Sequence, residues 1–262
     1  MTSADNAQTA PGLLLVLNGC EERLQFALGR TRPDGGHDLL ASRQWTVPGQ
    51  SVKYLVPGVA GTLESLALGP EHIHRIACTR GPGSFTGMRL VLAAAMGLAA
   101  GGNLQVAGLD YLPLLASGPM QLLEGTLHVL TYARRGQVYV QSFDSSGGAP
   151  LCPPRAVKID EAVEHVRAHD PHAALMGTGL RKNPEAIAAL LADMPSLRAL
   201  DALWDNPTPE TLLTQAEAAS FATGDIEPMY LRASDAEDNL PQIAAKRGID
   251  PEEAKKKLPK YL

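Results

Sequence analysis

The sequence predicts an α/β protein of two related halves, each a mixed sheet flanked by helices. Three observations favour this class: an opening run of three strand-like segments, an alternation of apolar strands and amphipathic helices after it, and a second, looser copy of the same order. The chain has 262 residues, of which 45% are hydrophobic, enough to bury a core. Its formal net charge of -5 argues against unaided binding to nucleic acid.

The first half begins at Leu13 after a polar segment, 1–12, that we expect to be a disordered tail. The runs LLLVLNG, RLQFALGR and LLASRQWTV are separated by polar or Gly/Pro turns, which predicts an antiparallel meander. Apolar residues then recur at helical spacing over 51–68, before the stop signal Gly69-Pro70. The elements expected next are a strand over 75–79, a helix over 84–100 closing at Gly101-Gly102, and a strand over 104–107.

The second half repeats this order. The runs LHVLTYA and QVYVQSFD flank a turn at 134–136, and a Pro-rich link follows them. The later elements expected are a helix over 160–169, a strand in ALMGTG, and helices over 183–194 and 210–223. Two such halves predict a duplicated actin-like, or ribonuclease-H-like, fold. The predicted divisions are a first lobe over 13–117, a second lobe with a returning C-terminal strand over 118–237, and a charged helical tail over 238–262.

A glycine-rich turn before the long helix is the most informative local motif. Its glycines allow a tight backbone, and Ser84 or Thr86 would cap a helix whose N–H groups can hold an anion. A structural strand-to-helix turn explains the same residues, since the lysine of a P-loop is missing. The residues of this motif are Gly81, Pro82, Gly83, Ser84, Phe85, Thr86, Gly87, Met88 and Arg89.

The helix after the motif is apolar on all sides and rich in small residues. Ala93, Gly97 and Gly101 fall four apart, so another helix can approach closely along that stripe. Two interpretations follow: a helix buried within this chain, or a helix shared with a partner subunit.

The stretch TRGPGSFTGMRLVLAAAMGLAAG closely resembles the signature of the TsaB (YeaZ) family, a dimerisation subunit of the bacterial tRNA threonylcarbamoyladenosine system. The turn at 133–139 resembles that family's second hairpin, and 228–232 with Ala236 and Glu237 its C-terminal strand. The resemblance implies a cytoplasmic, non-catalytic subunit with an actin-like fold. It also implies docking on the catalytic relative TsaD, a third partner in the ATPase TsaE, and homodimers when TsaD is absent. Contact with tRNA would come only through the complex.

The partner surface implied by the resemblance lies on the two helices of the first lobe, where apolar faces can bury a substantial area. The chain alone is expected to bind no cofactor and no membrane, so any nucleotide would lie at the subunit boundary. The expected interface residues are Leu55, Val56, Val59, Leu63, Leu66, Ala93, Gly97 and Gly101.

The sequence departs from the family where the first strand ends. Asn18 stands in place of an aspartate, which weakens a cation site, and Glu21 and Glu22 would repel phosphate, so independent ATP hydrolysis is not expected. The segment 110–115 has no imidazole to match the catalytic relative's metal-binding histidine pair, and His72 with His74 are expected on the surface.

Two rival functions remain open on sequence alone: an actin-like ATPase or metallopeptidase, and a freestanding homodimer that binds a small ligand. Arg134 and Arg135, at the hairpin turn, form either a contact to RNA phosphate or a partner carboxylate, or a solvated tip. Three scattered cysteines fit neither a disulfide framework nor a zinc site and indicate a reducing cytoplasm.

Overall fold

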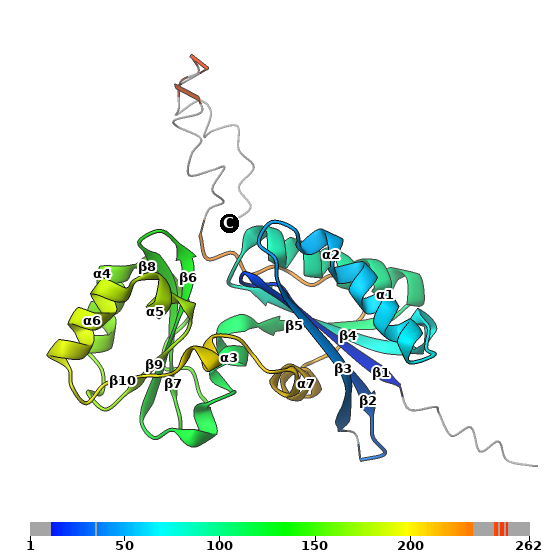
Figure 1. Ribbon diagram of the computed structural model, residues 1–262, viewed down its shortest axis with the longest axis horizontal. Helices are drawn as coiled ribbons and strands as arrows, with labels where there is room; N and C mark the ends of the chain where they lie inside the picture. The colour runs from blue at the N-terminus through cyan, green and yellow to red at the C-terminus, as the bar shows by residue number, and fades with distance from the viewer. Residues whose placement is uncertain (1–11, 35, 233–243, 246, 249, 251–262) are drawn as a thin grey trace, which may run out of the picture. The chain divides into compact units, whose positions relative to one another are not determined.

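The computed structural model describes residues 12–34, 36–232, 244–245, 247–248 and 250. The chain divides into two compact units, 1–229 and 230–262. The first contains both sheets (Figure 1). The predicted N-terminal tail and the predicted charged helix after Asp250 lie outside the described residues, apart from Gly12 and Asp250 themselves.

The first sheet has five strands in the order β3-β2-β1-β4-β5. Its antiparallel meander confirms the prediction: Leu13 pairs with Arg30, and Arg23 with Thr46. Parallel pairing of Leu15 with Ile76 and of Ile76 with Val106 completes the sheet. The strands are β1 (Leu13–Asn18), β2 (Arg23–Thr31), β3 (His37–Thr46), β4 (Ile73–Gly81) and β5 (Gln105–Asp110).

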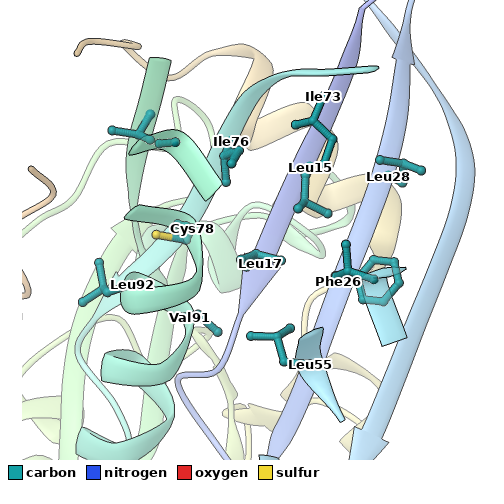
Figure 2. Close-up of a cluster of buried hydrophobic side chains, with 14 of the residues drawn as sticks. Leu15, Leu17, Phe26, Leu28, Leu55, Ile73, Ile76, Cys78, Val91 and Leu92 are labelled. Carbon is teal, nitrogen blue, oxygen red and sulfur yellow. The ribbon is translucent and has the colours of Figure 1, made fainter. Parts of the chain in front are cut away.

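Two helices, α1 (Leu55–Ser65) and α2 (Phe85–Gly102), cover one face of this sheet (Figure 1). Figure 2 shows Leu55 of α1 and Val91 of α2 beside Leu17 and Phe26 of the strands, in one hydrophobic cluster. α2 runs through Gly102 and ends at Asn103 in the left-handed conformation, with φ of 51°, rather than at Gly101-Gly102.

The second sheet has the order β10-β9-β6-β7-β8, so its first, second and third strands in sequence lie as β1, β2 and β3 do. Its strands are β6 (Thr126–Arg134), β7 (Gln137–Asp144), β8 (Arg155–Lys158), β9 (Ala174–Met176) and β10 (Arg198–Ala199). Its helices are α4 (Ile159–Arg167), α5 (Thr178–Lys182) and α6 (Pro184–Asp193). This repeated order of mixed sheets with flanking helices confirms the predicted duplicated α/β fold.

Several boundaries differ from the prediction. The strand in ALMGTG stops at Met176, because Gly177 has a φ of +106° and Thr178 begins α5. β8 and β10 lie in stretches read as a link or a loop, since each is too short to show a period. No strand is assigned to the described residues 228–232. The predicted return to the first sheet is visible at Met229, whose N–H donates to the Arg80 carbonyl of β4 at 2.6 Å, but without the regular strand that was predicted.

Two further helices lie where the chain passes between the two sheets. α3 (Tyr111–Ala116) follows β5 and contacts β6 and β7 as well as the first sheet. α7 (Pro209–Glu217), predicted within the second half, packs on β1, β2 and β3. A Cβ at Gly29 would lie 2.8 Å from Leu213, so α7 sits directly against β2. The chain therefore returns to the first sheet earlier than predicted.

Candidate partner surface and lobe junction

The glycine-rich motif seats the start of α2 on the turn between β1 and β2. The Ser84 N–H donates to the Cys20 carbonyl at 2.5 Å, and the Ser84 hydroxyl accepts from the Gly87 N–H at 3.2 Å. A Cβ at Gly83 would lie 2.1 Å from the Cys20 oxygen, and one at Gly87 2.0 Å from the Gly19 oxygen. Because carbonyl oxygens face this helix start, the contacts favour the structural turn over a phosphate site.

The other residues of the motif also lie close to neighbouring groups. The bond between Gly81 and Pro82 is cis, and Gly81 has a φ of +120°. A Cβ at Gly81 would lie 2.6 Å from the Met229 oxygen. The Arg89 guanidinium lies 3.7 Å from the centroid of the half-buried Phe85 ring, while Thr86 is exposed.

The predicted interface residues divide into two groups. Leu55, Val59 and Leu63 are 1%, 7% and 4% exposed and pack into the first core, so they are not available to a partner. Val56 is 60% exposed and Leu66 39%. We call the outward faces of α1 and α2 the outer helical face. Its exposed residues on the two helices include Val56, Ala60, Ala93, Gly97, Ala100 and Gly101.

Packing within the described chain does not require the glycines on the outer helical face. Apart from the chain neighbours and the nearby backbone of α2 itself, no described heavy atom lies within 4 Å of where a Cβ at Gly97 or Gly101 would be. Each glycine inside a helix costs about 0.5–1 kcal/mol relative to alanine. By contrast, Gly58 on the inner side of α1 is needed, because a Cβ there would lie 2.4 Å from the Trp45 ring.

α2 also has the length and composition of a membrane span. Among the described residues it alone passes that test, which core helices of water-soluble proteins pass too. Met88, Val91, Leu92, Ala95 and Ala99 face the first core, so one side of α2 is already covered by protein.

Asn18, at the end of β1, is buried in a network of neutral groups. Its Oδ1 accepts from the Thr79 hydroxyl at 3.1 Å and from the Cys20 N–H at 3.3 Å, and its Nδ2 donates to Gln25 at 2.8 Å. Asn18 is 1% exposed. Its polar atoms are thus engaged within the protein, which is unlike a cation ligand.

Glu21 lies where the turn after β1 meets the second lobe, at what we call the lobe junction: residues 18–22, Tyr111, 177–182 and Asp205. Its Oε2 accepts from the Tyr111 hydroxyl at 2.8 Å, and its Oε1 accepts from the Thr178 hydroxyl. Burial raises the pKa of Glu21 to about 7, although the hydrogen bonds from Thr178 and Tyr111 oppose the rise.

Acidic charge dominates the rest of the junction. Asp205 accepts from the Gly177 N–H and pairs with Arg181, both at 3.2 Å, and burial raises its pKa as well. An incoming phosphate would meet two carboxyl groups here. The predicted repulsion of phosphate by Glu21 is therefore consistent with where the structure places this side chain.

The hairpin arginines lie as expected at the turn after β6. Arg134 donates from Nε to Gln137 at 2.8 Å, and Arg135 is exposed beside Gly136, whose φ is +73°. Nothing in these contacts identifies a phosphate site.

The sequence reasoning missed a histidine cluster inside the second lobe. Rings of His128, His165 and His169 have centroids 4.4 to 5.8 Å apart. The sequence shows only that His165 and His169 are four residues apart, which predicts one helix face. The buried His128 comes from β6, far away in the sequence. No group of three potential ligands among the described residues is placed to hold a metal ion, and His72 and His74 are exposed as predicted.

Hydrogen bonds fix the protons of this cluster. Arg155 only donates, so His165 Nδ1, 3.2 Å away, accepts and its Nε2 carries the proton. That N–H donates to the Ser142 hydroxyl at 2.8 Å, which donates to His128 Nδ1 at 2.7 Å. His128 Nε2 has no hydrogen-bond partner among the described residues. Burial, with the nearby His169 and His165, lowers the pKa of His128 to about 3.

Known proteins resemble this chain along most of its length. The family model described as TsaD, tRNA N6-adenosine threonylcarbamoyltransferase, matches residues 48–192. The tRNA threonylcarbamoyladenosine biosynthesis protein TsaB of Escherichia coli is 30% identical over 238 residues, covering 87% of this chain and 98% of that protein. The chain belongs to the TsaB family.

Other relatives agree with this assignment. TsaB of Bacillus subtilis is 26% identical over 207 residues, covering 74% of this chain and 89% of the relative. The solved structure of YeaZ from Pseudomonas aeruginosa, at 21% identity and a TM-score of 0.58, covers 96% of this chain and all of its own, and shows the same fold. The predicted family is therefore confirmed, and the actin-like description of the fold with it.

Proposed function

We propose that this TsaB-family chain is a non-catalytic subunit that binds and activates TsaD, the threonylcarbamoyltransferase of tRNA threonylcarbamoyladenosine synthesis. Its relatives are named for that biosynthesis, and a family model described as TsaD matches its central residues. In this proposal TsaD transfers threonylcarbamoyl from its adenylate to adenosine in tRNA. The chain supplies a docking surface and meets tRNA only within the complex.

The outer helical face is the observation that supports this most directly. It presents Val56, Ala93 and Gly97 to solvent, and α2 has a single charged residue, Arg89, in eighteen. Exposed glycines let another helix come close, which this chain does not use internally. The same face would form the homodimer when TsaD is absent.

The lobe junction supports the non-catalytic part of the proposal. Asn18 is engaged by Thr79, Cys20 and Gln25, and the Glu21 carboxyl group lies between the lobes. This arrangement disfavours nucleotide binding by the chain alone, so any nucleotide would lie at its boundary with a partner. The proposal also includes the ATPase TsaE as third partner and a cytoplasmic location.

The test is threonylcarbamoyl transfer to unmodified tRNA by TsaD and TsaE of the same organism, given the adenylate precursor, with and without this protein. We expect transfer to require the protein and the protein alone to be inactive. A Gly97→Glu variant tests whether the outer helical face carries the effect. Unchanged transfer when the protein is omitted would refute the proposal.

A further inference from the structure

Two adjacent acids in the turn after β1 reach across to one helix of the second lobe. Glu21 accepts from the Thr178 hydroxyl, and Glu22 pairs with Lys182 at 3.0 Å. Thr178 and Lys182 are four residues apart on α5, so both acids hold the same side of that helix. We propose that Glu21 and Glu22 form a latch that holds the two lobes together without any bound ligand.

The direction of the central hydrogen bond is set by its surroundings. Thr178 Oγ1 accepts from the Tyr132 N–H at 2.9 Å, which leaves the hydroxyl proton of Thr178 for Glu21. Tyr111, which is fully buried, donates to the other carboxyl oxygen at 2.8 Å. Each oxygen of Glu21 thus has its own hydroxyl donor. One of them comes from the second lobe.

In the second lobe, the start of α5, which carries Thr178, packs directly against the backbone of β6. A Cβ at Gly177 would lie 2.4 Å from the Leu130 oxygen, and one at Gly179 2.7 Å from the same atom. Only glycines allow the start of α5 to lie so close to β6. Because this helix start is fixed independently of Glu21, loss of the latch should not unfold the second lobe.

The turn that carries Glu21 and Glu22 in the first lobe is held by hydrogen bonds that do not involve these two side chains. The Gly19 N–H donates to the Thr79 hydroxyl at 3.4 Å, and the Cys20 N–H donates to Asn18. The Cys20 carbonyl accepts from Ser84 at the start of α2. One turn therefore carries the latch and seats the helix of the outer helical face. The latch fixes where the second lobe lies relative to that helix.

Protonation of Glu21 should favour the closed form, because burial in that form disfavours the charged carboxylate. Around Glu21 lie Tyr111 of α3, Cys20 of the turn, Thr178 of α5, and Asp205, which pairs with Arg181; Glu22 with Lys182 lies beside them. Burial raises the pKa of Glu21 from 4.5 to about 7 in the closed form, whereas an open form returns it toward its ordinary value. The closed form thus binds the proton more strongly, and closure should grow as the pH falls from 7 to 5.

Distances between spin labels, measured by pulsed electron resonance on the full chain, test the latch. Labels go on Ser42→Cys of β3 and Glu185→Cys of α6, both exposed, in a Cys152→Ser background, since Cys20 and Cys78 are buried. The variants are Glu21→Ala and Thr178→Val, which remove one partner each. The matched control is Glu161→Gln at an exposed position of α4, which removes one negative charge as Glu21→Ala does.

We expect a single narrow distance distribution in the wild type and in Glu161→Gln. Glu21→Ala and Thr178→Val should add a longer-distance population. Glu21→Gln does not titrate; its amide oxygen can accept from one hydroxyl, and its NH2 group can donate to the oxygen of the other. It should stay closed and lose the pH response between 8 and 5 that the wild type shows. Unchanged distributions in folded Thr178→Val and Glu21→Ala would overturn the latch. If Glu21→Ala does not fold, Thr178→Val and Glu21→Gln decide.

Discussion

The helices at equivalent places in the two lobes have similar inner faces and different outer faces. Along the chain, α1 connects the third and fourth strands of the first sheet, and α2 connects the fourth and fifth. In the second sheet α4 and α6 occupy the corresponding places. α4 has four charged residues in nine, whereas α2 has one in eighteen. A duplicated core explains the inner faces in both lobes. The outer face of the first lobe carries few charges, with Glu64 and Arg89 exposed on the two helices. This requires a further cause, and the proposed partner helix would supply one.

The charged residues of the second lobe show what a solvated helix of this fold looks like. Glu164 and Arg167 of α4 pair at 2.7 Å, and Arg167 also reaches Asp193 of α6 at 2.5 Å. Such pairs stabilise exposed helices modestly and keep them in water. α1 and α2 carry instead Val56, Ala93 and Gly97 at exposed positions. The second lobe is thus an internal control for the first.

The largest expected effect tests whether the inner faces are in fact alike. Leu63→Ala in α1 and Leu190→Ala in α6 should each lower the free energy of unfolding by about 3 kcal/mol, because both side chains are buried in a core. Urea unfolding of the isolated protein measures this. Val56→Ala, at an exposed position of α1, is the control and should change it by no more than about 0.5 kcal/mol. A small change in the free energy of unfolding for Leu63→Ala would contradict its burial in the core and favour the prediction from sequence that Leu63 contacts a partner.

The second prediction concerns the histidine cluster, which only the second lobe has among the described residues. His128 has a pKa of about 3 when folded against 6.5 for the free side chain, so the unfolded chain binds more protons below pH 6.5. Stability should be complete above about pH 7 and fall by about 2 kcal/mol on going to pH 5 through this group alone.

Comparing the wild type with His128→Asn isolates this effect. Asparagine keeps an acceptor for the Ser142 hydroxyl and does not titrate. Glu21 contributes in the opposite direction, because its raised pKa makes stability fall as the pH rises from 4.5 to 7, and it is common to both proteins. The stability difference between wild type and variant should therefore change between pH 8 and pH 5. A constant difference would contradict the assignment.

The smallest expected effect is a gain. Gly97→Ala should raise the free energy of unfolding of the isolated chain by about 0.5–1 kcal/mol, since the new methyl group meets open space and alanine favours the helix. Thermal unfolding measures it. Gly58→Ala is the contrasting variant and should lower stability, because its Cβ would clash with Trp45. Destabilisation by Gly97→Ala would mean that Gly97 is needed within the chain.

Periodicity predicted the elements that are long. The meander from Leu13 to Thr46 and the helices α2, α4 and α6 follow patterns of alternation or helical spacing that a single sequence shows. The inward placement of Leu55, Val59 and Leu63 was recognised only in the structure. Helical spacing finds an apolar face without saying whether a sheet or a partner covers it.

The lobe junction could not be predicted from local patterns. Glu21 and Thr178 are separated by 157 positions, and neither belongs to a periodic segment. Glu21 in isolation suggested only repulsion of phosphate. Its partners Tyr111 and Thr178 come from α3 and α5, whose placement depends on packing of the whole chain. The cluster around His128 was missed for the same reason.

Affinity for TsaD of the same organism tests the central claim most directly, with Gly97→Glu compared with Ala188→Glu at an exposed position of α6. A charge buried without a partner costs about 3 kcal/mol or more, so Gly97→Glu should weaken binding at least about 100-fold while the variant remains folded. Ala188→Glu should bind as the wild type does. Wild-type affinity in folded Gly97→Glu, or an equal loss in Ala188→Glu, would contradict the account.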